Sequence, residues 1–434
     1  MTVRADPESI FVLAHLLDAA IAGAKTPLAL VIMAGFAQFP LVDDSRLGFL
    51  AFIPLSLTKG FAAFRFRSPS DSAPVGAGHT NSVKPSGVKS RLEEKTVQVV
   101  AGVDLGGTAI NYTLVNREEQ FLIEGLCEHP ALSKQGPEIC LQQIADGLNF
   151  AADKAGVALG DVVAIGLDTP GPASAAGQLS ARGSTNFVHP KWAGFDIREG
   201  LAHKLGMPVS YLNDANAAAL WGHYSIFGAN SRETSVSDVV GTGNGGGIIL
   251  DGNVVKGKNG FGGELGHVLT PYQSIVGIVG IKPHCNCGRI GDLESLCSLT
   301  AIERTLLPYH LQQYPSHELA KLESHQAAKL VRGLADQGDP MSKEIFRVQA
   351  HALGLFFDEM VNTFDPDALI IGGGVLETSL EFQRWFLAEI RVGMPTQRAE
   401  QANIPIHVMP NGDTAGARGA ALEALKLARQ SGLA

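Results

Sequence analysis

The chain has 434 residues, of which 34 are basic and 43 acidic, giving a formal net charge of −9. This length suits two or three domains with a large buried core. Hydrophobic residues make up 45% of the chain, which excludes disorder throughout. The acidic balance and the lack of a basic stripe disfavour a protein held on nucleic acid by charge. Small anionic ligands can still bind to backbone amides.

The cysteines and the N-terminus bear on the compartment. Five cysteines in a chain of this length form an odd, sparse set, which does not indicate a secreted disulfide framework. The first ten residues carry charges of both signs and lack the basic segment and apolar core of a signal peptide. We therefore expect a cytoplasmic protein.

The first 95 residues differ in composition from the rest. Residues 26–42 and 47–58 carry no charge, but the longer run only just reaches membrane-spanning length and is interrupted by prolines, so a membrane hairpin is disfavoured. Two other interpretations of residues 1–67 stay open: an apolar, partner-facing extension, or a start codon assigned too early. Residues 68–95, rich in Ser, Pro, Gly and Lys, are typical of a flexible linker.

After Lys95 the chain alternates short β-branched runs with longer helical stretches, which predicts an α/β fold. We expect two lobes, at 96–232 and 233–434. The predicted strands cover 97–104, 110–116, 162–168, 209–214 and, with a turn, 368–375. The predicted helices cover 134–155, 196–206, 216–227, 317–337, 341–364 and 413–429.

Two segments of the chain resemble each other. Residues 99–115 and 236–252 both run from a strand through a glycine-rich turn to a second strand, with Gly106 and Gly243 in step. The simplest explanation is a duplicated fold with one glycine-rich hairpin in each half.

Three glycine-rich turns predict a phosphate-binding site, because phosphate must approach backbone amides closely and a Cβ would block that approach. They are DLGGT (104–108), GTGNGGG (241–247) and GGG (372–374). Each alone is more often an ordinary tight turn, but three at strand ends in two related halves are far more specific. The candidate nucleotide-binding residues are Asp104, Gly106, Gly107, Thr108, Thr242, Gly243, Gly373 and Gly374.

These motifs, with four more, resemble the ROK family of bacterial sugar kinases and sugar-responsive repressors. The further motifs are TPGP (169–172), NDANAAAL (213–220), GGELGH (262–267) and CNCGRIGDLES (285–295). The resemblance covers about residues 97–427 in order, and nothing comparable marks residues 1–95. It implies a duplicated actin/hexokinase-like (ribonuclease H-like) ATPase fold, with two lobes around a cleft.

Asp214 ends a predicted strand, where sites form in α/β proteins, and could accept the proton of a sugar hydroxyl. The plainer interpretation is that Asn213 and Asp214 cap the next helix. The resemblance implies that Asp214 is the catalytic base. It also implies a sugar-binding set of Gly171, Asn186, Asn213, Glu264, His267 and Glu294. Asn186 is farther from Trp192 than in the family's pattern.

The resemblance also implies a structural zinc ion held by one histidine and three cysteines. Here His267, Cys285 and Cys287 match, but Asp292 stands where the third cysteine is expected. Asp292 could be an oxygen ligand, since Zn²⁺ accepts carboxylates. Alternatively, Cys297 or His284 replaces it, or the site holds no metal.

The leading hypothesis is an ATP-dependent hexose kinase using Mg²⁺. A sugar-sensing regulator is the alternative from another class, although no basic recognition helix is visible in residues 1–95. A non-catalytic sugar-binding protein is a third, motivated by Asp292, Ala109 and His223, which depart from the family's kinases. The expected partners are a sugar and ATP, with no nucleic acid or membrane, and the default assembly is a symmetric dimer.

Overall fold

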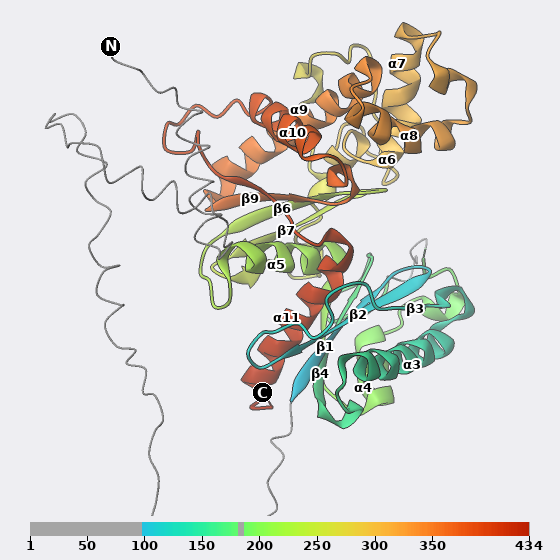
Figure 1. Cartoon of the computed structure of the whole chain (residues 1–434), viewed down its shortest axis with the longest axis vertical. Helices are drawn as coiled ribbons and strands as arrows, with labels where there is room; N and C mark the ends of the chain where they lie inside the picture. The colour runs from blue at the N-terminus through green and yellow to red at the C-terminus, as the bar shows by residue number, and fades with distance from the viewer. Residues whose placement is uncertain (1–97, 181–185, 434) are drawn as a thin grey trace, which may run out of the picture. The chain divides into compact units, whose positions relative to one another are not determined.

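A computed structural model describes residues 98–180 and 186–433 (Figure 1). The extension expected at 1–67 and the linker expected at 68–95 lie outside these residues. No helix among the described residues has both the length and the apolar character needed to cross a membrane.

The first half contains a five-stranded sheet in the order β3-β2-β1-β4-β5. The strands are β1 (Val99–Leu105), β2 (Ala109–Asn116), β3 (Glu128–Pro130), β4 (Val162–Thr169) and β5 (Val209–Asn213). Strand β1 is antiparallel to β2 and parallel to β4, which is parallel to β5. Helices α3 (Pro137–Ala155) and α4 (Ile197–Leu205) cover one face of this sheet.

The apolar run of β1 is explained by burial on both faces. Val99, Ala101 and Val103 pack in the core shared with α3 and α4, whereas Val100 packs against the C-terminal helix α11 (Ala415–Gln430). Gly102 lets α11 come close, because a Cβ there would lie 1.9 Å from the carbonyl oxygen of Ala417.

The second half repeats this sheet. Its strands are β6 (Ser235–Val240), β7 (Asn244–Leu250), β8 (Asn253–Val254), β9 (Ala368–Gly372) and β10 (Ile406–Val408). Their order is β10-β9-β6-β7-β8, with β6 antiparallel to β7 and parallel to β9, as β1 is to β2 and β4. The duplication expected from the two glycine-rich hairpins is confirmed.

The helices of the second half were predicted less completely. After α5 (Asp214–Phe227), which ends the first half, they are α6 (Leu299–Ala301), α7 (Leu307–Gln313), α8 (Ser324–Asp336), α9 (Pro340–Phe364) and α10 (Leu380–Val392), with α11 last. The helix expected over 317–337 is a 3-10 turn at Glu318–Lys321 followed by α8, because residues 322–323 are extended or turn-like between them. Helices α7 and α10 and strand β10 had not been predicted.

The last helix of each half packs on the sheet of the other half. Helix α5, which follows β5, packs on β6 and β7, while α11, which follows β10, packs on β1 and β4. The two helices also pack against each other (Figure 1). The lobe boundary expected at 232/233 falls between α5 and β6. Helix α11 belongs to the expected second lobe by its position in the chain, but it packs on the first sheet.

Candidate active site

A cleft of about 920 Å³ lies between residues of the two halves. Many of the predicted site residues line it. They are Asp104, Gly171, Asn213 and Asp214 from the first half and its junction, and Gly243, Glu264, His267, Glu294 and Gly373 from the second. The ends of β1, β5 and β9 and the β6–β7 turn therefore meet at one place.

Asp214 is the first residue of α5 and lines the cleft. Its Oδ1 accepts a hydrogen bond from the backbone N–H of Ala215 at 2.7 Å. Burial raises the pKa of Asp214 to about 7; the Ala215 hydrogen bond opposes this shift, and the charges of Asp104 and Glu264 add to it. A carboxylate with such a pKa can exchange a proton near neutral pH.

Capping of α5 is carried out mainly by Asn213. Its Oδ1 accepts from the backbone N–H groups of Ala215 at 3.0 Å and Asn216 at 3.4 Å. The capping interpretation therefore applies to Asn213, while its Nδ2 faces Gly171: a Cβ on Gly171 would lie 3.4 Å from that nitrogen and 3.7 Å from Oε1 of Glu264. Gly171, Asn213 and Glu264 thus form one polar wall of the cleft.

A buried carboxyl pair lies at the end of β1 and had not been predicted. Asp104 and Asp168 are register partners on the parallel strands β1 and β4, and Asp168 is fully buried. Burial, followed by the charges of Asp104 and Asp214, raises the pKa of Asp168 well above its ordinary value. Burial also raises the pKa of Asp104, and the neighbouring Asp168 opposes that shift. Two buried carboxyls this close disfavour ionisation of both, so protonation of Asp168 is favoured.

Asn186 lies beside the first glycine-rich turn and does not line the cleft. A Cβ on Gly107 would lie 2.4 Å from Oδ1 of Asn186. Ser133 connects the two segments, donating from Oγ to the carbonyl oxygens of Gly107 and Asn186 at 2.8 and 2.9 Å. Trp192 is buried and donates from Nε1 to the carbonyl oxygen of Ser133 at 2.7 Å. The longer Asn186–Trp192 segment is therefore anchored at both ends.

The glycine-rich turns differ in their surroundings. In the first, the Gly106 N–H donates to the carbonyl oxygen of Ala109 at 3.0 Å, and Thr108 is exposed. In the second, Gly243 leaves room for Glu294, because a Cβ at Gly243 would lie 2.7 Å from Oε2 of that residue.

A second cavity of about 450 Å³ adjoins the cleft, and Gly241 lines both. Thr242 and Gly374 line this second cavity together with Lys329 and Arg332. The two basic residues come from α8. Nothing in the sequence indicated that α8 contributes to a site, because it contains no recognisable motif.

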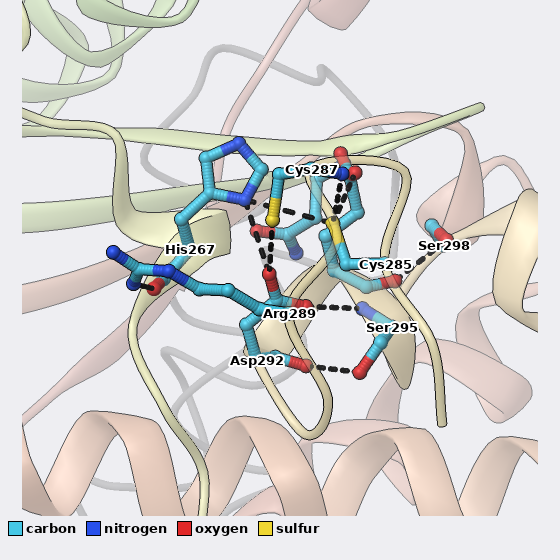
Figure 2. A network of polar contacts seen from close by, with 9 residues as sticks. His267, Cys285, Cys287, Arg289, Asp292, Ser295 and Ser298 are labelled. Carbon is cyan, nitrogen blue, oxygen red and sulfur yellow. Dashed lines mark hydrogen bonds and ion pairs between the residues drawn. The ribbon is translucent and has the colours of Figure 1, made fainter. Parts of the chain in front are cut away.

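Four side chains converge in one polar network (Figure 2), and one of them, His267, lines the cleft. Ligand atoms of His267, Cys285, Cys287 and Asp292 all lie within 4.8 Å of one another. Nδ1 of His267 is 3.2 Å from Oδ2 of Asp292 and 3.7 Å from Sγ of Cys285, and Sγ of Cys287 is 3.3 Å from that Oδ2. A tetrahedral zinc ion would separate such ligand atoms by about 3.3–3.8 Å. The donor set and its spacing fit zinc.

The alternative ligands lie outside this cluster. Cys297 is buried and its thiol donates to the carbonyl oxygen of Gln349 at 3.2 Å, and His284 is exposed. Burial raises the pKa of Asp292, but hydrogen bonds with Cys285, Cys287 and His267 hold it below the ordinary value overall. Arg289, inside the same motif, donates to the carbonyl oxygen of His267 at 2.8 Å and lines the cleft.

The sequence profile described as "ROK family" matches residues 100–427. The chain belongs to the ROK family. A glucokinase of Thermotoga maritima is 31% identical to this ROK protein over 277 residues, which are 63% of this chain and 81% of that one. A xylose repressor of Caldicellulosiruptor bescii is 29% identical over 290 residues, covering 64% and 66%.

Solved ROK structures share the fold. The ROK hexokinase of Thermus thermophilus has a TM-score of 0.60 and 30% identity, covering 77% of this chain and 100% of that one. A ROK glucokinase of Streptomyces griseus, solved with glucose and AMPPNP, has a TM-score of 0.56 and 26% identity, covering 76% and 99%. The expected duplicated actin/hexokinase-like fold, with two lobes around a cleft, is confirmed.

Proposed function

We propose that this ROK protein is an ATP-dependent kinase of a hexose hydroxyl, with Asp214 as the general base. The observation that carries the proposal is Asp214 itself: it lines the cleft between the two halves, and burial raises its pKa to about 7. The similar glucokinase and the ROK structure containing glucose and AMPPNP support the same reaction class.

In this reaction the sugar hydroxyl oxygen forms a bond to the γ-phosphorus of ATP. The bond from that phosphorus to the oxygen bridging to the β-phosphate breaks, ADP leaves, and Asp214 takes the hydroxyl proton. General-base assistance of this kind contributes about 10²–10⁴-fold. The Ala215 N–H on Oδ1 fixes the carboxylate's orientation at the start of α5.

The acceptor sugar would lie against Gly171, Asn213 and Glu264, with His267 and Glu294 completing the wall. Burial raises the pKa of Glu264, the His267 charge opposes the shift, and the Glu294 charge adds to it. Side chains that each bond two hydroxyls give a sugar site its selectivity, because an unpaired buried group is costly. Asn186 would join this set from beside Gly107 if the halves close on the ligand.

The nucleotide would use the glycine-rich turns. Gly243 and Gly373 line the cleft, and Thr242 and Gly374 line the adjoining cavity, where Lys329 and Arg332 supply positive charge. Gly106, Gly107 and Thr108 form the corresponding turn of the first half. The carboxyl of Asp104 would hold Mg²⁺ through water, and Mg²⁺ would neutralise charge on the transferred phosphoryl group.

We also propose that His267, Cys285, Cys287 and Asp292 hold a structural zinc ion. Because Nδ1 of His267 faces this cluster, the rest of the ring is left for the cleft that it lines. Zinc would fix the ring of His267 beside the sugar.

The test measures ADP release from ATP and Mg²⁺ across a panel of hexoses and N-acetylhexosamines. We expect one sugar class to stimulate release, and Asp214→Asn to lower kcat by about 10²–10⁴-fold. Asp153→Asn, an exposed residue on α3, is the matched control and should retain wild-type rates. Equal rates for wild type and Asp214→Asn would overturn the role of Asp214.

A sugar-binding regulator is the second candidate, favoured by the similarity to a xylose repressor. Calorimetric titration of the same sugars distinguishes the two. Sugar binding without ADP release from any sugar would support the regulator or the non-catalytic sugar-binding protein over the kinase.

A further inference from the structure

Asp238 is a buried carboxyl that the proposed chemistry does not use. It lies on β6 with no exposed surface, and its Oδ2 accepts a hydrogen bond from Nδ2 of Asn244 at 2.9 Å. Its Oδ1 has no hydrogen-bond partner among the described residues. Burial raises the pKa of Asp238 to about 7, and the Asn244 hydrogen bond opposes the shift. A buried carboxyl with a single donor is costly, so an apolar residue would serve the core better.

Asn244, the partner of Asp238, touches two parts of the candidate sugar site. It is the first residue of β7, and its backbone N–H donates to Oε2 of Glu294 at 3.1 Å. Its other contact is with Gly266, between Glu264 and His267: a Cβ on Gly266 would lie 2.2 Å from the carbonyl oxygen of Asn244 and 3.1 Å from its Oδ1. One residue therefore orients Glu294 and supports the 264–267 turn.

The backbone of this region is secured independently of the Asp238–Asn244 bond. Strands β6 and β7 pair in register from Ser235↔Ile249 to Val240↔Asn244, and the Gly241 N–H donates to the carbonyl oxygen of Gly243 at 2.9 Å. Loss of the side-chain bond would leave this ladder in place. It would release the Asn244 side chain, whose Oδ1 lies beside Gly266 in the 264–267 turn.

We propose that Asp238 is a positioning residue: by holding the Asn244 side chain against Gly266, it keeps the 264–267 turn, with Glu264 and His267, in the geometry that binds the sugar. This inference rests on the proposed function only in taking a sugar as the ligand of the cleft. Because Glu264 and His267 would bind the sugar before the reaction as well as during it, a disturbed pair should weaken sugar binding and leave the chemical step largely intact.

The test exchanges the two side chains. Asn244→Asp sets two carboxyls against each other, and we expect the sugar KM and Kd to rise about tenfold with kcat within about twofold of wild type. The double variant Asp238→Asn with Asn244→Asp restores an amide–carboxylate bond in the opposite direction. Its KM should return to within about threefold of wild type. Ser237→Ala, a neighbouring buried polar residue on β6, is the matched control and should change neither constant.

Steady-state kinetics with the best acceptor of the panel, calorimetric sugar titration and melting temperatures are measured on each variant. If Asn244→Asp does not fold, Asn244→Ala replaces it, with the same expected rise in KM. The proposal is overturned if Asn244→Asp, or Asn244→Ala in its place, lowers only the melting temperature. It is also overturned if the double variant fails to recover KM and Kd. If the wild type binds sugar without releasing ADP, the kinase proposal is overturned, but the comparison of Kd values still tests the role of Asp238. If the wild type binds no sugar, the kinase proposal and the role of Asp238 are both overturned.

Discussion

At the scale of single residues, the basicity of Asp214 comes from its surroundings. Burial disfavours the carboxylate, and the acidic neighbours Asp104 and Glu264 add to this effect, so the pKa rises to about 7 in spite of the Ala215 hydrogen bond. A carboxyl at its ordinary pKa would be a weak base. The same acidic neighbours that raise the pKa belong to the candidate metal and sugar sites, so ligand binding and basicity are coupled.

The pKa of Asp214 sets the expected pH dependence of the reaction. Because only the deprotonated form accepts the hydroxyl proton, kcat/KM should rise with pH up to about 7 and level off above it. Each pH unit below that value should lower the rate about tenfold. The measurement is a pH–rate profile from pH 5 to 9, with Asp214→Asn expected to lose the acidic limb. A wild-type kcat/KM that does not change between pH 5 and 9 would contradict the assignment.

At the scale of elements, the segment 284–297 connects the sugar wall to the metal ligands. Cys285 donates from Sγ to Oε1 of Glu294 at 3.3 Å, so the cysteine loop and the candidate sugar carboxylate touch directly. A zinc ion would take Cys285 as a thiolate and fix the loop, so loss of the metal would leave His267 less well held beside the sugar wall.

The purified protein should therefore contain about one zinc per chain, and a strong chelator should lower both the melting temperature and sugar affinity. Asp292→Ala should lose the metal, whereas Asp292→Cys should retain it. Elemental analysis and thermal unfolding check these outcomes, with Cys127→Ala as the control, because that buried thiol lies in the other half. Zinc content unchanged in Asp292→Ala would exclude Asp292 as a ligand.

The sequence predicted the elements whose signals are local. The hairpins around Gly106 and Gly243 could be predicted because the residues that form each turn are adjacent in the chain. Residues whose partners are distant in the chain had no such signal: Asn186 lies beside Gly107, and Asp168 beside Asp104. The bond between Asp238 and Asn244 is local, but the hairpin pattern alone does not show which side chains will meet. A pattern of residue types predicts strands and turns, but it does not indicate which buried carboxyls will face one another.

At the scale of the whole molecule, buried acids make stability depend on pH. The pKa values of Asp104, Asp168, Asp214 and Asp238 are all raised in the folded state. A raised carboxyl pKa means that the folded protein keeps a proton that the unfolded chain releases near pH 4. Their contribution to stability is therefore present at low pH and is lost as pH rises through the folded-state pKa values.

Asp168→Asn should relieve part of this loss, because an amide carries no charge to bury beside Asp104 and Asp214. We expect its melting temperature at pH 8 to exceed that of wild type by about 2–4 °C, and the difference to shrink at pH 5. Calorimetry at the two pH values measures this, with Asp153→Asn as the exposed control. A variant that is less stable than wild type at pH 8 would show that the carboxyl pair is favourable.

The exchange of α5 and α11 between the two sheets has a consequence for how the protein is made. The first sheet is complete once residue 213 has been synthesised, yet the helix that covers its second face is α11, at residues 415–430. Val100 and Gly102 therefore cannot pack against α11 until almost the entire chain has left the ribosome. Neither half can finish folding before the other has been translated, so any nascent chain truncated before α11 exposes an apolar sheet face to chaperones and proteases.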